Sequence, residues 1–197
     1  MTSPARTFPV TTADEFLTRS LPDGKAELVR GEIRLAPPAS GPHGGVGGNL
    51  FLLLGAYVRQ RGLGRAFPDG TGYELVKLPH TVRVPDVSFV RAERLPPGGL
   101  RPGFLTLAPD LAVEILSPTE RASELQEKLD DYRAAGTSLV WVIDPPRRTV
   151  RVLDGELAER TLGEEDTLDG GVTIPGFSCR VAALFDGIAR DERTLGS

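Results

Sequence analysis

The run Leu-Ala-Val-Glu-Ile-Leu at residues 111–116 restricts the fold more than any other part of the sequence. Side chains alternate between the two faces of a strand, so Glu114 shares one face with Ala112 while Leu111 and Val113 lie on the other. Apolar side chains on both faces are typical of a strand that is covered on both sides. We therefore expect a sheet with helices packed on it.

Further apolar runs predict the other strands of this sheet. Two short alternating segments within residues 26–35 flank a glycine-containing turn and predict a β-hairpin. The remaining expected strands are residues 72–78, 81–90, 139–143 and 149–153.

Helices are expected where apolar residues recur with helical spacing. Residues 12–19 predict a short helix, residues 43–61 predict a core helix that ends at Gly62, and a last helix is expected near residues 181–189.

A capping signal marks the start of one further helix. Ser117 is suited to the N-cap, Pro118 to the first helical position, and Glu120 to a capping box. The apolar stripe that follows predicts a helix as far as residue 135, where Gly136 supplies the stop.

The order of these elements predicts one mixed sheet flanked by α-helices, which is an α/β or α+β fold. The 197 residues, 40% of them hydrophobic, have an ordinary globular composition and predict a single domain over residues 1–197. No stretch is long and apolar enough for a membrane span or a signal peptide, which favours a cytoplasmic protein. Cys179 is the single cysteine and can form no internal disulfide.

Two carboxylates interrupt apolar strands. In residues 81–90, Asp86 shares one strand face with Val82, Val84 and Val90, and Glu114 lies in the run described above. An unpaired buried carboxylate costs several kcal/mol, so each needs a partner. If the two strands are neighbours, one Mg²⁺ or Mn²⁺ ion could bridge both carboxylates. The alternative is that Asp86 faces water at a strand end and that Glu114 pairs with an arginine.

The segments Pro85-Asp86 and Glu114-Ile115-Leu116 resemble the PD-(D/E)XK pattern of restriction endonuclease-like enzymes. A wider series resembles the Uma2 family of that superfamily from about residue 15 to about residue 153. It comprises Glu27 to Glu32, His43, Val84 to Val90, Pro109 to Pro118, Lys128 to Tyr132, Gly136, and Trp141 to Pro145.

This resemblance implies a restriction endonuclease-like fold, with a central mixed sheet, flanking helices and an N-terminal hairpin. It also implies a Mg²⁺- or Mn²⁺-dependent endonuclease that acts on DNA. Asp86 and Glu114 would hold the metal, and Glu27, at the first acidic position of the family, would contact it directly or through water.

The lysine that this pattern places two residues after the glutamate is replaced by Leu116. Lys128 borders the apolar face of the following helix and could orient or activate the attacking water instead. The alternative is a solvated lysine paired with Glu124. His43 could contact phosphate or the water shell of a metal, or it could be a capping or packing residue.

The net charge of −4 is unusual for a nuclease, because phosphate binding relies on Lys and Arg. A non-catalytic binding or assembly module that keeps the nuclease fold is therefore an alternative. A two-carboxylate glycoside hydrolase is a weaker one, since one Trp and three Tyr offer few aromatic surfaces for a sugar. Cleavage of both DNA strands needs two sites, so a homodimer is possible.

Overall fold

A six-stranded sheet forms the centre of the computed structural model, which describes residues 11–118, 120–155 and 159–190. Its strand order is β10-β9-β8-β7-β6-β3, and only β7 and β8 are parallel neighbours. The strands are β3 (Gly64–Pro68), β6 (Val87–Arg91), β7 (Leu111–Ile115), β8 (Leu139–Asp144), β9 (Thr149–Asp154) and β10 (Arg160–Leu162). The predicted mixed sheet is confirmed.

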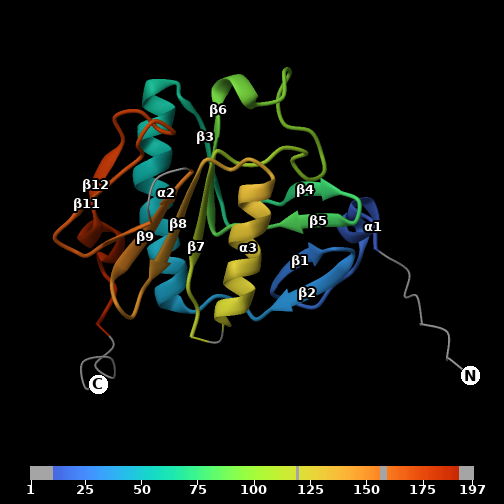
Figure 1. Ribbon diagram of the computed structural model, residues 1–197, viewed down its shortest axis with the longest axis horizontal. Coiled ribbons are helices and arrows are strands. Elements are labelled where there is room, and N and C mark those ends of the chain that lie inside the picture. Colours follow the sequence, from blue (N-terminus) through green and yellow to red (C-terminus); the bar gives the residue numbers. More distant parts are fainter. Residues whose placement is uncertain (1–10, 119, 156–158, 191–197) are drawn as a thin grey trace, which may run out of the picture.

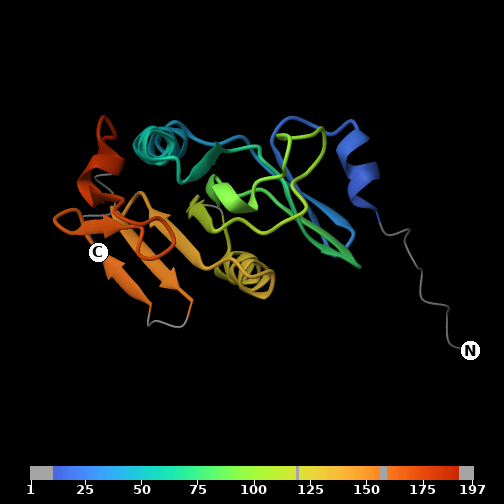
Figure 2. The same ribbon diagram turned by 90° about the horizontal axis from the view of Figure 1, so that it is seen from above.

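Two helices cover opposite faces of this sheet, as Figures 1 and 2 show. On one face, α2 (Gly41–Arg61) packs Leu50 and Leu54 into the core that holds Val113 and Ile115. On the other face, α3 (Ala122–Ala134) packs against residues that include Ala112, and its buried side chains are Leu125, Leu129 and Tyr132. Strand β7 is thus covered on both sides, and Glu114 lies on the α3 face.

A smaller four-stranded sheet lies beside the large one, on the right in Figure 1. Its order is β2-β1-β5-β4, formed by β1 (Lys25–Val29), β2 (Glu32–Ala36), β4 (Tyr73–Lys77) and β5 (His80–Arg83), and α1 (Ala13–Thr18) packs on it through Phe16. The predicted hairpin is the β1–β2 pair. Arg30 and Gly31 both have positive φ in its two-residue turn, which matches the twist of the strands.

The strand predicted over residues 81–90 is two strands, and that prediction was wrong. The chain leaves the small sheet after β5 and enters the large sheet at β6. Pro85 has no N–H to donate to a ladder, and the Asp86 N–H donates instead to the carbonyl of Val113, 2.9 Å away. Asp86 consequently lies at the junction between the two sheets.

The start of α3 also differs from the prediction. The helix begins at Ala122 rather than after Ser117, and Glu124 accepts from the backbone N–H of Arg121. Ser117 and Glu120 form a turn instead, with the Glu120 N–H 3.1 Å from the Ser117 carbonyl. The helix ends as predicted, with Gly136 at φ 92°.

Short elements complete the described chain. The hairpin of β11 (Thr167–Asp169) and β12 (Ser178–Arg180) precedes η2 (Val181–Phe185), and η1 (Ala92–Arg94) follows β6. The helix predicted near residues 181–189 is only this short 3₁₀ segment, because Asp186 is extended and Gly187 has φ 72°. Strand β3 was not predicted. In the described part of the chain, no helix could cross a membrane.

Candidate functional site

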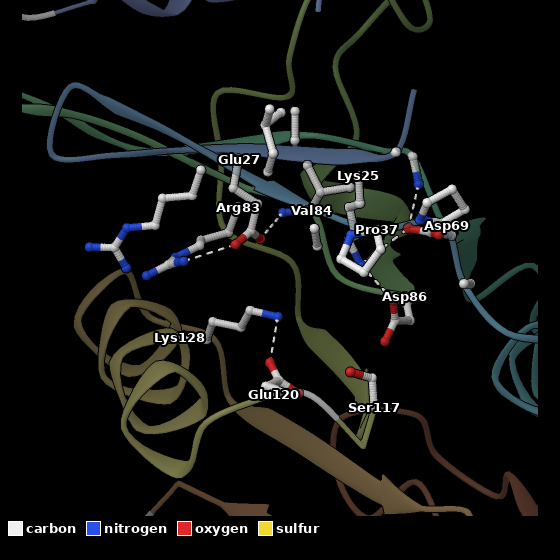
Figure 3. Close-up of a pocket in the computed structure, with 18 of the residues that line it drawn as sticks. Lys25, Glu27, Pro37, Asp69, Arg83, Val84, Asp86, Ser117, Glu120 and Lys128 are labelled. Atoms are coloured by element: carbon white, nitrogen blue, oxygen red, sulfur yellow. Dashed lines mark hydrogen bonds and ion pairs between the residues drawn. The ribbon is translucent and has the colours of Figure 1, made fainter. Parts of the chain in front are cut away.

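A cavity of about 1140 Å³ opens where the small sheet, the start of α2 and the segment before α3 meet. Figure 3 shows Lys25, Glu27, Asp86 and Lys128 directed into it from these different elements. It therefore brings together all but one of the side chains that the sequence singled out, and the remaining one, Glu114, lies just beneath its wall.

Asp86 is 5% exposed, and its two carboxylate oxygens have three partners. Oδ2 accepts from the Ile115 N–H at 2.7 Å and lies 3.3 Å from Nε2 of His43, while Oδ1 lies 2.5 Å from Nζ of Lys25. Burial alone would raise the pKa of this carboxyl, but His43 and Lys25 hold it well below its usual value. Asp86 is thus an anion rather than a solvated strand-end residue.

Glu114 is 1% exposed and is held from α3. Its Oε2 lies 2.8 Å from Nζ of Lys128, and its Oε1 accepts from the Tyr132 hydroxyl at 2.7 Å. Burial raises the pKa of the Glu114 carboxyl, against the charges of Lys128 and Lys25. The partner of Glu114 is therefore a lysine and not the arginine considered above.

The side chain of Lys128 points into the site rather than into solvent. Besides Glu114 it contacts Glu120, at 3.0 Å, so the pairing with Glu124 considered above was wrong. Burial lowers the pKa of the Lys128 ammonium, but the charges of Glu114, Glu27 and Glu120 more than reverse this and raise it. Lys128 is a permanent cation beside Glu114.

Glu27 supports the strand junction. Its Oε1 accepts from the N–H of Val84 and its Oε2 from Nη1 of Arg83, both at 2.9 Å. The buried guanidinium of Arg83 also reaches Asp131 of α3 at 2.6 Å. Glu27 thereby fixes the segment that leads to Asp86, and Arg83 ties this segment to α3.

Two further site residues were missed or misread. Lys25 was not predicted, although it lies two residues before Glu27 on β1 and so shares its face. His43, for which the sequence left open a role at the site or as a capping or packing residue, faces Asp86 from the first turn of α2. The alternation of β1 could have pointed to Lys25, but no local pattern places His43 beside Asp86.

The charge of the cavity is balanced. The cavity is lined by five Lys and Arg residues (Arg19, Lys25, Arg34, Arg83 and Lys128) and by five carboxylates (Glu27, Asp69, Asp86, Glu120 and Glu124). Four of the five cations, Lys25, Arg34, Arg83 and Lys128, pair with carboxylates. Few cations are left to bind phosphates directly.

The donor chemistry of Asp86 and Glu114 suits Mg²⁺ or Mn²⁺. Within the described ranges, no group of three or more His, Cys, Asp or Glu side chains is arranged to hold a metal ion. Mg²⁺ nevertheless commonly uses only one or two carboxylates and completes its shell with water and substrate phosphates. Burial is the main cause of the raised pKa of Glu114, and the nearby charge of Asp86 acts in the same direction.

A mixed sheet flanked by helices, with acidic residues at a junction beside it, places the chain in the class of α/β proteins with a restriction endonuclease-like fold. The model of the Uma2 family, described as "Putative restriction endonuclease", matches residues 13–182. The chain therefore belongs to the Uma2 family.

A solved structure has the same fold. The crystal structure of "a putative nuclease belonging to DUF820" from Anabaena variabilis superposes with a TM-score of 0.78 at 23% identity, covering 89% of this chain and 97% of that one. At this identity the likeness shows the fold alone. No curated protein matches the chain.

Proposed function

We propose that this protein is a metal-dependent endonuclease that hydrolyses phosphodiester bonds in DNA. The observation that carries the proposal is the pair of buried carboxylates, Asp86 and Glu114, beneath one cavity with a lysine at each. Membership of a nuclease-like family supports the same reaction class.

In this proposal Asp86 and Glu114 would hold a Mg²⁺ or Mn²⁺ ion, and Glu27 would contact it directly or through water. When bound, the ion would supply a Lewis acid that polarises the phosphate. Glu27 also holds the Val84 backbone and so fixes the position of Asp86.

Lys128 has a defined role in the proposal. Its raised pKa keeps it protonated, so it donates hydrogen bonds but takes no proton from the attacking water. It orients that water and stabilises the charge that develops on phosphate. It thus takes the place of the lysine that the family pattern would put at Leu116.

The experiment has a binding arm and a cleavage arm. Calorimetry with Mn²⁺ should show binding by the wild type that is lost in the Asp86→Asn/Glu114→Gln double variant and kept in Asp130→Asn, an exposed carboxylate of α3. Cleavage of mixed DNA substrates should require the metal and disappear in Lys128→Ala, with Lys77→Ala as the control. Circular dichroism confirms that each variant is folded.

A non-catalytic module is the second candidate, and the balanced cavity favours it. Metal binding without cleavage of any DNA would support this module. If the folded wild type bound no metal at millimolar concentration, the nuclease proposal would be overturned. The glycoside hydrolase is disfavoured, because the lining residues of the cavity include neither Trp nor Tyr.

We further propose that the protein is a homodimer in the cytoplasm. Size-exclusion chromatography with light scattering tests its assembly state.

A further inference from the structure

Lys25 is the cation that contacts Oδ1 of Asp86. It is one of only three lysines in the chain. Its Nζ lies 2.5 Å from Oδ1 of Asp86, while the other oxygen of Asp86 already faces the Ile115 N–H and His43. Lys25 therefore contacts Oδ1, the oxygen of Asp86 that neither the Ile115 backbone nor His43 contacts.

The ammonium of Lys25 is well placed to compensate several carboxylates at once. Its side chain is only 18% exposed, and it also lies 3.2 Å from Oδ1 of Asp69. The charges of Asp86, Glu114 and Asp69 all act on it. It thus supplies the positive charge that a buried Asp86 needs when no metal is bound.

A divalent ion and an ammonium repel each other at one carboxylate oxygen, so both cannot keep this position. Asp69, which lies near Lys25 in Figure 3, offers it a second partner, and the Asp69 side chain is 47% exposed. Movement of Nζ toward Asp69 would free Oδ1 of Asp86 without leaving the lysine unpaired.

We propose that Lys25 is an exchangeable counter-cation: it neutralises Asp86 in the metal-free protein and transfers to Asp69 when a divalent metal binds. This inference rests on the proposed metal site. Metal binding is then an exchange of one cation for another, and Lys25 lowers the affinity of the site while stabilising the metal-free fold.

The test uses Mn²⁺ calorimetry on the full chain with Lys25→Met, which keeps the length of the side chain and removes its charge. Without the competing ammonium, the Kd for Mn²⁺ should fall by about tenfold or more, within the range of ordinary coupling between two ligands. Lys77→Met is the matched control, because Lys77 is an exposed lysine on β4, and its Kd should equal that of the wild type.

Unfolding in denaturant distinguishes the proposed cation exchange by Lys25 from a purely structural role of this residue. Metal-free Lys25→Met should unfold at a lower urea concentration than wild type, and saturating Mn²⁺ should close that difference, since a ligand of the native state stabilises it. Lys25→Gln, which is neutral but can donate, gives the same reading if the methionine variant does not fold.

An unchanged or raised Kd in the neutral variants would overturn the exchange and leave the nuclease proposal intact. Tighter Mn²⁺ binding without DNA cleavage would support the exchange and count against the nuclease. Absence of Mn²⁺ binding in every variant would overturn both.

Discussion

At the residue scale, charges in this site are compensated in pairs that a single substitution breaks. Glu114 is enclosed by α3 and relies on Lys128 and Tyr132. Removing one partner of a buried pair leaves the other charge uncompensated, which costs more than the pair itself contributes.

Lys128→Met should therefore lower the free energy of unfolding by about 3–5 kcal/mol in the metal-free protein. The double variant with Glu114→Gln should recover much of this loss, because no buried charge then remains unpaired. Urea unfolding of the four proteins in the cycle measures the coupling. A loss below about 1 kcal/mol in the single variant would show that the pair is well solvated.

Cys179 gives a prediction that is independent of the proposed function. Burial raises the pKa of its thiol to about 11, and only the thiolate reacts with iodoacetamide. About one molecule in a thousand is thus thiolate at pH 8, and alkylation of the native protein should speed up about tenfold per pH unit from pH 7 to pH 10. The urea-unfolded chain is the control and should react much faster at pH 8. Equal rates for the two states at pH 8 would contradict the raised pKa.

At the element scale, the helix α3 shows how tertiary contacts override a local signal. Ser117, Pro118 and Glu120 match the sequence signature of a helix N-terminus. Glu120 nevertheless forms an ion pair with Lys128, and the helix begins later, at Ala122. The N-cap position is left to Arg121, whose side chain makes no capping hydrogen bond.

Arg121→Ser should consequently stabilise the protein by about 1 kcal/mol, because serine can accept from the exposed N–H groups of the first turn. The change also removes a positive charge from the positive end of the helix dipole. Arg133→Ser, in the last turn of the same helix, should bring no gain. The free energy of unfolding in urea distinguishes the two variants, and an equal effect of both would argue against capping.

The elements that the sequence predicted are those whose pattern is complete within one segment. The apolar run at residues 111–116 and the stripe of α2 could be recognised without knowing their partners. Strand β3 has a single buried residue, Phe67, and exists because it pairs with β6. The division of residues 81–90 likewise depends on which sheet each half joins.

The same distinction applies to the site. Asp86, Glu114 and Lys128 were recognisable because each is a charged residue on or beside an apolar face, and the structure brings them together. Lys25 and His43 belong to the site only because the small sheet and the start of α2 meet at Asp86.

At the scale of the whole molecule, the net charge of −4 and the paired cations of the cavity limit how the protein can bind DNA. Each phosphate neutralised by a free cation makes the slope of log K against log salt more negative by about 0.9, and slopes are given below as magnitudes. We expect a slope of only about 1–2 for a duplex, measured by fluorescence anisotropy without divalent metal. A slope steeper than about 5 would show that a basic surface outside the cavity dominates binding.

The chain crosses from the small sheet to the large one at Asp86 and forms β6, and the following strand, β7, comes only after the long connection that includes Gly98 and Gly99. A cut at these exposed glycines would leave Asp86 in one fragment and Glu114 with Lys128 in the other. Strands β6 and β7 still pair across such a cut. If Asp86 and Glu114 form the proposed metal site, neither fragment alone would hold the metal, and metal binding would report that the two fragments had associated.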